Sequence, residues 1–281
     1  MFLYRYNNTT IPRGASMNPS SIAMAASTLL HCRQQQVRVA SLASKCTPAT
    51  LAEGYEIQQA VAQLRPKPLI GYKVGLTNER AQREAGTHEP IVGQLFAPDI
   101  VHSGATLLPA HSQMRAVEAE VTFQLGATLD PAAAPFKRSQ VHSSIRDAFA
   151  SIEVCDSRFV NCDDLTLPCI VADNSNAGAL VLGESIAWRH ESDFDSLGVA
   201  LSRGHTVVAE GSTNNVLGNP LESLCWLANW LAARDIPLEA GQLVATGTCT
   251  PIITGMPGDH FVALFGAGAQ VELTFAGKQF P

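Results

Sequence analysis

The sequence has little of what a nucleic-acid-binding or membrane-spanning protein needs. Its formal net charge is −6, and no run of lysine or arginine is longer than two residues. A nucleic-acid binder needs a concentrated basic surface to replace phosphate counterions, so this class is set aside. No apolar stretch approaches the roughly 20 residues that span a bilayer, and the first residues lack the sustained apolar segment of a secretory signal. We therefore expect a cytoplasmic protein with no membrane and no nucleic-acid partner.

Several common catalytic motifs are also missing. No CxxC, HxxxH or HxH pattern occurs, so a zinc site or a dithiol redox site has little support. A GxSxG elbow and a GxxxxGKS loop are absent, and the GxG elements near the C-terminus open no helix. The seven cysteines are scattered, and although Cys155, Cys162 and Cys169 recur every seven residues, the residues between them do not support one helix. Buried, reduced thiols are the expected outcome.

The composition is that of a folded protein with a substantial core. Hydrophobic residues make up 46% of the 281 positions and charged residues 16%. This length allows one large domain or two modest ones, and the composition argues against intrinsic disorder. Because a monomer of this size usually exposes more charge, the low charged fraction predicts a homo-oligomer whose contacts cover part of the surface.

Helix signals are concentrated near the beginning of the chain. Apolar residues recur at helical spacing in residues 21–36. A second amphipathic segment covers about 50–64, with Pro48 near its start and Pro66 beyond its end. These two segments predict a helical N-terminal region.

Strand signals dominate the rest of the chain. The expected helices there are 78–85, 139–150 and 220–234. The expected strands are 69–76, 116–126 and 151–158, two strands around a turn within 169–183, a hairpin at 197–210 and short strands from 243 onward. Strict alternation of strands and helices is missing, which argues against a doubly wound parallel sheet and favours an α+β fold.

These patterns divide the chain into three parts. Residues 1–20 read as a disordered extension, with Met17 as an alternative start of the chain. A helical N-terminal region is expected over 21–68. A β-rich body over 69–281 follows, and we expect it to act as a single functional unit.

The first chemical signal is the pair Glu118 and Glu120. Residues two apart in a strand point to the same side, and adjacent carboxylates repel each other unless a cation lies between them. On its own this pattern also fits a solvated strand face. Glu153, however, lies in a similar apolar frame, where an unpaired carboxylate is costly to bury. A shared Mg²⁺ or Mn²⁺ ion would resolve both costs, since hard oxygen ligands suit these metals.

The second signal is Lys73, which stands inside the short apolar segment GYKVG. A buried lysine keeps its charge only beside a partner, and near a metal it would transfer a proton or hold a substrate carboxylate. A lysine that snorkels to the strand edge is the alternative. Asp156 is a further metal-ligand candidate, or the partner of Arg158 in an ordinary ion pair.

Two polar loops are weaker candidates. Asp173 to Gly178 forms a polar turn between two apolar segments, and Asn174 and Ser175 in it could line a pocket. Gly247 to Pro251 places Thr248 and Thr250 beside a glycine, where hydroxyl and backbone donors could hold a carboxylate. Plain turns explain both segments equally well.

Taken in order, these segments resemble a known family, over roughly residues 21–276. The resemblance is to the 2-keto-4-pentenoate hydratase and 4-oxalocrotonate decarboxylase group of the fumarylacetoacetate hydrolase superfamily. The segments that carry it are GYEIQQAV, GYKVGLTNERAQ, EPIVGQLF, VEAEVTF, SIEVCDSR, VADNSNAGALVLG, PLESLCWLANWLA and GTCTPIITGMPGDHFVALFG.

The resemblance implies a mixed β-roll body behind a helical N-terminal portion. It implies a metal-dependent lyase of aromatic meta-cleavage catabolism that acts on 2-hydroxy-dienoates or their 2-oxo tautomers. Mg²⁺ or Mn²⁺ would be held at Glu118, Glu120 and Glu153, and Lys73 would serve in proton transfer. Homo-oligomers, and association with another enzyme of the meta-cleavage pathway, are further implications.

One departure from the family pattern bears on the reaction. Hydratases of this group often carry Pro-Asp before the glycine of the EPIVG segment, whereas this chain has Pro90-Ile91-Val92-Gly93. The missing carboxylate weakens the case for hydration specifically. Decarboxylation of the 4-oxalocrotonate type, C–C hydrolysis of acylpyruvates and a non-catalytic structural role stay open beside it.

Overall fold

The computed structural model describes residues 17–66, 68–108, 112–266 and 268–277. Residues 1–16, most of the expected extension, lie outside the described part. The first helix, α1 (Pro19–Gln35), begins slightly before the expected boundary at residue 21. Asn18 caps this helix by accepting a hydrogen bond from the Ser21 backbone N–H, and Pro19 stands in the first turn, where its missing N–H costs nothing.

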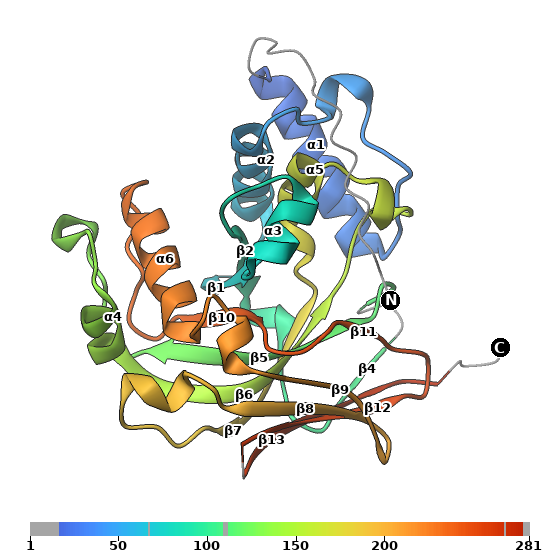
Figure 1. The fold of residues 1–281 in the computed structure, drawn as a ribbon. Helices are drawn as coiled ribbons and strands as arrows, with labels where there is room; N and C mark the ends of the chain where they lie inside the picture. Colours follow the sequence, from blue (N-terminus) through green and yellow to red (C-terminus); the bar gives the residue numbers. More distant parts are fainter. Residues whose placement is uncertain (1–16, 67, 109–111, 267, 278–281) are drawn as a thin grey trace.

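Three helices pack together into the helical part of the molecule (Figure 1). They are α1, α2 (Leu51–Leu64) and α5 (Leu167–Ala172). Thr50 and Glu53 form a capping box that starts α2. Leu29 of α1, Ile57 of α2 and Val171 of α5 meet in one buried apolar cluster. This cluster joins the N-terminal helices to the body, because α5 belongs to the later part of the chain.

The larger sheet carries the centre of the fold. Its strand order is β2-β1-β10-β5-β6-β7-β3, with β11 paired to β5. The strands are β1 (Leu69–Gly75), β2 (Ile91–Phe96), β3 (Ile100–His102), β5 (Ala116–Leu125), β6 (Ile145–Cys155), β7 (Ala179–Ser185), β10 (Leu243–Thr248) and β11 (Ile253–Thr254). The long antiparallel pair β5–β6 lies in its middle.

A second, smaller sheet packs against the first and closes the core. Its strand order is β4-β13-β12-β8-β9, and β13 contacts both β6 and β7. The strands are β4 (Ala105–Leu107), β8 (Gly198–Arg203), β9 (Thr206–Ser212), β12 (His260–Phe265) and β13 (Ala269–Phe275). Phe261 and Val271 of this sheet share one buried cluster with Val121 and Ile152 of the larger sheet. The curled pair of sheets is seen edge-on in Figure 1.

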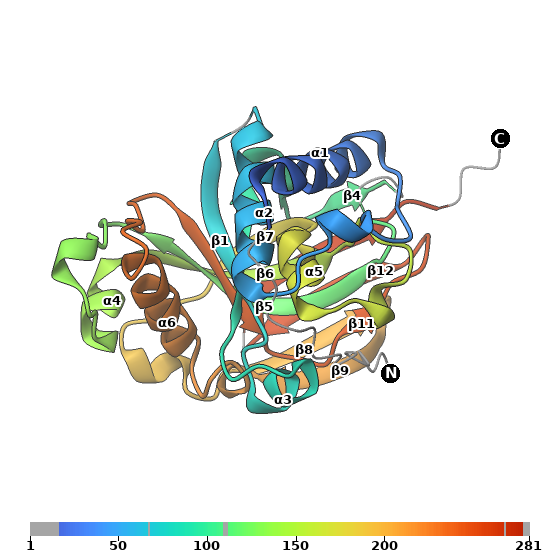
Figure 2. The same cartoon turned by 90° about the horizontal axis from the view of Figure 1, so that it is seen from above.

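The remaining helices are α6 (Pro220–Ala232), α4 (Arg138–Ser144) and α3 (Glu79–Ala85). Helix α6 buries Leu224 and Leu227 and packs on β10 and α4, as seen in Figures 1 and 2. Helix α3 follows β1, with Asn78 as its N-cap. In the described ranges no helix is both long enough and apolar enough to cross a membrane. The expected α+β fold with a β-roll body and N-terminal helices is confirmed.

Two segments differ from the sequence prediction. The helix expected over 139–150 ends at Ser144, and β6 begins at Ile145 because residues up to 155 pair with β5. The strand expected at the start of 169–183 is helix α5. A short buried apolar run has the same pattern in a helix and in a strand, so periodicity alone could not separate the two.

Candidate metal centre and active-site cleft

The β5–β6 register brings the predicted carboxylates together. Glu118 lies directly opposite Glu153, and Glu120 lies on the same face of β5, opposite Ser151. Glu120 is 0% and Glu153 1% exposed, whereas Glu118 is partly exposed and lines a cleft. The larger sheet therefore holds a buried acidic cluster of three glutamates at its centre.

The buried carboxylates are only partly satisfied by protein groups. Glu120 Oε2 accepts a hydrogen bond of 2.9 Å from the Gly247 backbone N–H. Glu120 Oε1 and Glu153 Oε2 have no hydrogen-bond partner among the described residues. Buried polar atoms in folded proteins are almost always paired, so these oxygens fit a bound cation. Oxygen donors of this kind suit Mg²⁺ or Mn²⁺.

Lys73 supplies the one positive charge that touches the cluster in the described structure. It lies on β1 between β2 and β10, is 4% exposed, and places Nζ 3.2 Å from Glu153 Oε1. Burial alone would lower the pKa of Lys73, but Glu153 and the other acidic groups outweigh burial and raise it above its ordinary value. Lys73 is therefore a buried, charged lysine, and the alternative of a side chain snorkelling to solvent is wrong.

The carboxylates carry more negative charge than one lysine can offset. Burial raises the pKa of Glu120 well above its ordinary value, and Glu153 and Glu118 raise it further. Burial also raises the pKa of Glu153 to about 7, against the opposing effect of Lys73. Burial and mutual repulsion therefore disfavour the charged forms of Glu120 and Glu153, a cost that a bound divalent cation would remove.

Metal affinity should consequently depend on pH. Below about pH 7, Glu153 holds a proton that must leave before a cation binds, so Mn²⁺ affinity should fall as the pH is lowered, by about tenfold per pH unit for each proton released. Calorimetric titration with Mn²⁺ at pH 6 and pH 8, in buffers of different ionisation enthalpy, measures both affinity and proton release. An affinity that is independent of pH would contradict this assignment.

A cleft of about 1090 Å³ opens beside the acidic cluster. Lys73 and Glu118 lie in its wall, together with Ser175, Thr248 and Thr250, three of the four predicted substrate-binding residues. Thr248 Oγ1 donates to the Thr250 carbonyl, whereas Thr250 Oγ1 is buried and has no partner among the described residues. Thr250 thus keeps a hydroxyl available for a ligand.

Asn174, which was expected to line a pocket, does not lie in the wall of the cleft. Its side chain pairs with the backbone of Gln94, accepting from the N–H at 2.7 Å and donating to the carbonyl at 2.8 Å. Ser175 Oγ likewise donates to the Val92 carbonyl at 2.8 Å. Asn174 therefore fixes the loop to β2, and the cleft is lined instead by Ser175 and Asn176.

Asn176 is a candidate that sequence reasoning did not single out. Residues 174–176 all adopt left-handed backbone conformations, with φ between 51° and 57°. Such a conformation costs roughly 1–2 kcal/mol per non-glycine residue, and the side-chain bonds to β2 help to hold it. Asn176 Oδ1 is buried and has no partner among the described residues. The polar run DNSN was the only signal in the sequence.

Gly93 provides the space in which Lys73 and this loop meet. A Cβ atom at Gly93 would lie 2.7 Å from the Asn174 carbonyl oxygen and 2.9 Å from Lys73 Cγ. We expect Gly93→Ala to displace both and to cost about 1–3 kcal/mol of stability, with a loss of turnover. Gly198→Ala is the matched control, since no atom lies within 4 Å of its added Cβ. Equal melting temperatures and activities for the two variants would refute this role.

The alternative of an ion pair between Asp156 and Arg158 is wrong. Arg158 instead forms a buried ion pair with Asp173, and it also donates to the Asp173 carbonyl at 2.6 Å. Asp156 pairs with Arg38 at 3.0 Å. The two charged residues are only two positions apart, just after β6, but face different partners. Because Asp173 immediately precedes the left-handed loop, the Arg158 pair helps to anchor that loop.

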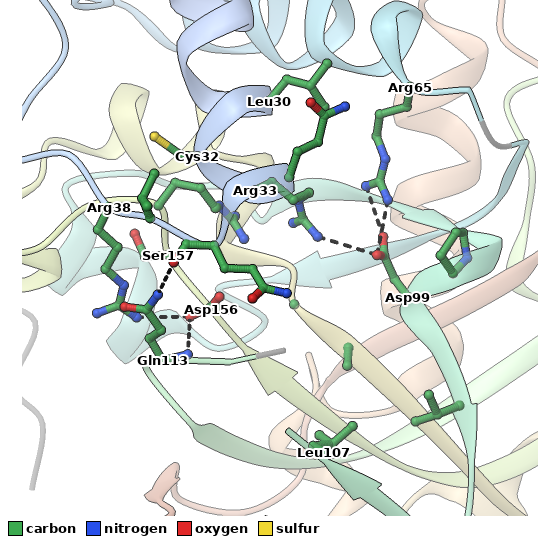
Figure 3. Close-up of a pocket in the computed structure, with 18 of the residues that line it drawn as sticks. Leu30, Cys32, Arg33, Arg38, Arg65, Asp99, Leu107, Gln113, Asp156 and Ser157 are labelled. Carbon is green, nitrogen blue, oxygen red and sulfur yellow. Dashed lines mark hydrogen bonds and ion pairs between the residues drawn. The ribbon is translucent and has the colours of Figure 1, made fainter. Parts of the chain in front are cut away.

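A second cavity of about 340 Å³ lies between α1 and the body (Figure 3). In this view Arg33 and Arg65 converge on Asp99, while Arg38 reaches Asp156. The closest of these contacts measure 3.0 Å. These pairs join the N-terminal helical region to Asp99, just before β3, and to Asp156, just after β6, and the acidic cluster does not take part in them.

The comparisons with known proteins agree with this architecture. A sequence model described as "Fumarylacetoacetate (FAA) hydrolase C-terminal" matches residues 72–279. The chain belongs to the fumarylacetoacetate hydrolase family. The matched span contains the three glutamates, Lys73 and the loops around the cleft. The family prediction made from the sequence motifs is thereby confirmed.

Within this family, the chain is similar to hydratases and decarboxylases of 2-oxo acids. A 2-keto-4-pentenoate hydratase of Paraburkholderia xenovorans is 29% identical over 267 residues, 94% of this chain and 98% of the relative. A 4-oxalocrotonate decarboxylase of a Pseudomonas species is 29% identical over 229 residues, 80% of this chain and 86% of that relative. The solved 4-oxalocrotonate decarboxylase from Pseudomonas putida G7, complexed with magnesium and adipate, superimposes with a TM-score of 0.86 at 25% identity, covering 93% and 100% of the two chains. The expectation of an enzyme from this hydratase and decarboxylase group is confirmed.

Proposed function

We propose that this enzyme is a divalent-metal-dependent lyase that hydrates a 2-hydroxy-dienoate, the enol form of a 2-oxo acid, in the catabolism of aromatic compounds. The observation that carries the proposal is the acidic cluster with Lys73 at the wall of a large cleft. The similarity to hydratases over nearly the full chain supports the same substrate class.

The acidic cluster fits Mg²⁺ or Mn²⁺ as the cofactor. Glu118, Glu120 and Glu153 would hold the ion, since their oxygens are hard donors and two of those oxygens, Glu120 Oε1 and Glu153 Oε2, lack partners among the described residues. When bound, such an ion stabilises negative charge on a substrate carboxylate and on the neighbouring 2-oxygen. Calcium and magnesium complexes of the related decarboxylase support a divalent ion of this kind.

Lys73 is the proposed proton carrier. Its ammonium group is held in the charged form by Glu153, 3.2 Å away, at the wall of the cleft. From that position it can give a proton to a substrate carbon and take the proton of the enol oxygen. Transfer of both protons within the cleft converts the dienol to a 2-oxo acid, whose conjugated double bond can then add water.

Other residues would orient the substrate and limit access of water. Thr250 Oγ1 and Asn176 Oδ1 are buried and have no partner among the described residues. The Thr250 hydroxyl could donate to the substrate carboxylate, and the Asn176 amide oxygen could accept from a substrate hydroxyl. The apolar part of the cleft wall suits the hydrocarbon portion of a dienoate. Its residues are Val74, Leu76, Ile91, Ile170, Leu217, Pro251 and Ile252.

Product analysis with defined acids tests the proposal. Freshly generated 2-hydroxypenta-2,4-dienoate is mixed with the protein plus Mg²⁺, and in parallel with the protein plus EDTA. We expect metal-dependent loss of the ultraviolet band of the dienol and formation of a 4-hydroxy-2-oxo acid. Loss of the band without the hydrated product would count against hydration.

Decarboxylation is the second candidate, and Ile91 favours it. Ile91 is 4% exposed and lines the cleft at the position where hydratases of this group often have a carboxylate. An acid that guides water is therefore missing there, whereas loss of CO₂ needs no such group. Release of CO₂ from a 2-hydroxymuconate-type dicarboxylate would establish this activity. Turnover of neither acid would favour acylpyruvate hydrolysis or a structural role beside another pathway enzyme.

We also propose that the chain forms a homo-oligomer. The charged fraction of 16% is low for a monomer, and large apolar side chains such as Val207 and Leu264 are more than two-fifths exposed on the smaller sheet. Light scattering of the purified protein gives the mass directly. Co-purification with another enzyme of the meta-cleavage pathway would identify a partner.

A further inference from the structure

Cys155 lies next to the acidic cluster. It stands two residues after Glu153 on β6, so the two side chains point to the same face. Cys155 is 5% exposed and lines the cleft beside Lys73 and Glu118. Its thiol is thus a soft donor at the edge of a cluster of hard donors.

The geometry brings this thiol within reach of a shared ion. Cys155 Sγ and one carboxylate oxygen each from Glu118 and Glu153 lie within 4.8 Å of one another. Ligand atoms bound to one ion at about 2.0–2.4 Å are separated by no more than roughly 4.7 Å. Small side-chain rotations would therefore let these three atoms bind one cation.

An independent observation points to the same position. Glu153 is almost completely buried, its Oε1 contacts only Lys73 Nζ, and its Oε2 has no hydrogen-bond partner among the described residues. Glu120, in contrast, directs Oε2 to the Gly247 N–H and is not part of the group that includes the thiol. The centre therefore contains two overlapping donor sets, one of three carboxylates and one of two carboxylates with a sulfur.

We propose that Cys155 is a metal ligand for thiophilic divalent cations such as Zn²⁺, Co²⁺ and Cd²⁺. Glu118, Glu153 and the Cys155 thiolate bind these ions, whereas Mg²⁺ and Mn²⁺ use the three glutamates. On binding, the S–H bond breaks, its proton passes to the solvent, and a metal–sulfur bond forms without any change of oxidation state. The inference deepens the proposed function, since it rests on the same metal centre.

Competition between the two kinds of ion follows from the shared ligands. Glu118 and Glu153 belong to both donor sets, so only one cation can occupy the centre at a time. N/O/S sites generally bind Co²⁺ and Zn²⁺ more tightly than Mn²⁺, and a thiolate increases that preference. Zn²⁺ should therefore displace Mn²⁺ from this enzyme at comparable concentrations. Cys155 sets the size of the preference for Zn²⁺ over Mn²⁺.

Cobalt spectroscopy tests the assignment without any substrate. Co²⁺ is titrated into the full-length, reduced, metal-free protein and into Cys155→Ser and Cys225→Ser variants. Cys225 is the matched control, because it lies on α6 and takes no part in the acidic cluster or the wall of the cleft.

The wild type and Cys225→Ser should show a thiolate-to-cobalt charge-transfer band in the near ultraviolet that saturates at one equivalent. Cys155→Ser should lack the band and bind Cd²⁺ at least about tenfold more weakly, with Mn²⁺ affinity within about twofold of wild type.

The outcomes separate this inference from the proposed function. If Mn²⁺ binds but the cobalt band is absent, or if the band persists in Cys155→Ser, the cysteine assignment is overturned and the carboxylate centre stands. If the band depends on Cys155 but no dienoate is turned over, the assignment stands and the proposed reaction fails. Circular dichroism and melting curves of Cys155→Ser show that any lost band is not a loss of folding.

Discussion

Glu120→Gln should reduce metal-dependent turnover by about a thousandfold or more while leaving the protein folded. Glutamine is almost isosteric and can still accept the hydrogen bond from the Gly247 N–H. It cannot carry the negative charge that a divalent cation needs, and metal-stabilised charge is a contribution of several kcal/mol to such reactions. The loss should therefore appear in turnover, with little change in structure.

The same substitution should make the metal-free protein more stable above neutral pH. Burial, Glu153 and Glu118 all raise the pKa of Glu120 in the folded protein, so ionisation of this group weakens the fold as the pH rises above its unfolded pKa. Removing the charge removes this penalty, and a gain of about 1 kcal/mol would raise the melting temperature by about 2–4 °C. Glu56→Gln, on the exposed side of α2, is the control and should change neither property. Full activity in Glu120→Gln would contradict the metal assignment.

Lys73→Met is the second substitution with a large expected effect. Without the Nζ atom 3.2 Å from its carboxylate, Glu153 becomes a buried charge with no cationic partner. Breaking a buried pair in this way costs about 3–5 kcal/mol, and loss of a proton-transfer group lowers turnover by about 10²–10⁴-fold. Both effects should be visible in one variant, by thermal melting and by steady-state kinetics.

The stability loss of Lys73→Met should depend on pH and on metal. Loss of Lys73 raises the folded-state pKa of Glu153 further, so the destabilisation should grow as the pH rises from about 5 towards 8. A bound divalent cation replaces the missing positive charge, so Mn²⁺ should raise the melting temperature of this variant more than that of wild type. Lys45→Met, at an exposed position, is the control. Unchanged turnover in Lys73→Met would remove this lysine from the reaction.

The carboxylates and the lysine could be found from the sequence because local rules determine their setting. The two-residue period of a strand places Glu118 and Glu120 on one face, and the apolar neighbours of Glu153 and Lys73 signal burial. Burial of a charge without a visible partner was the decisive clue. The structure brings these four residues together, and their roles in metal binding and proton transfer stay predictions.

What the sequence could not provide depends on pairing between distant segments. That Glu118 faces Glu153 follows from the β5–β6 register, which no local pattern specifies. The place of Cys155 beside them follows from the same register. Asn174 was predicted to line the pocket, but its amide matches the backbone of Gln94, a contact between segments 80 residues apart. The ion pairs of Asp156 and Arg158 have the same cause. Asp156 pairs with Arg38 and Arg158 with Asp173, so neither partner could be read from the local sequence.

Binding of Mn²⁺, measured by electron paramagnetic resonance of the free ion, tests the central claim most directly. Wild-type protein at about pH 8 should bind one Mn²⁺ per chain, and Mg²⁺ in excess should release it. Glu118→Gln, Glu120→Gln and Glu153→Gln should each weaken binding by at least about tenfold, whereas Glu56→Gln should bind as wild type does. Failure of the wild type to bind Mn²⁺, or equal binding by all four variants, would contradict the account.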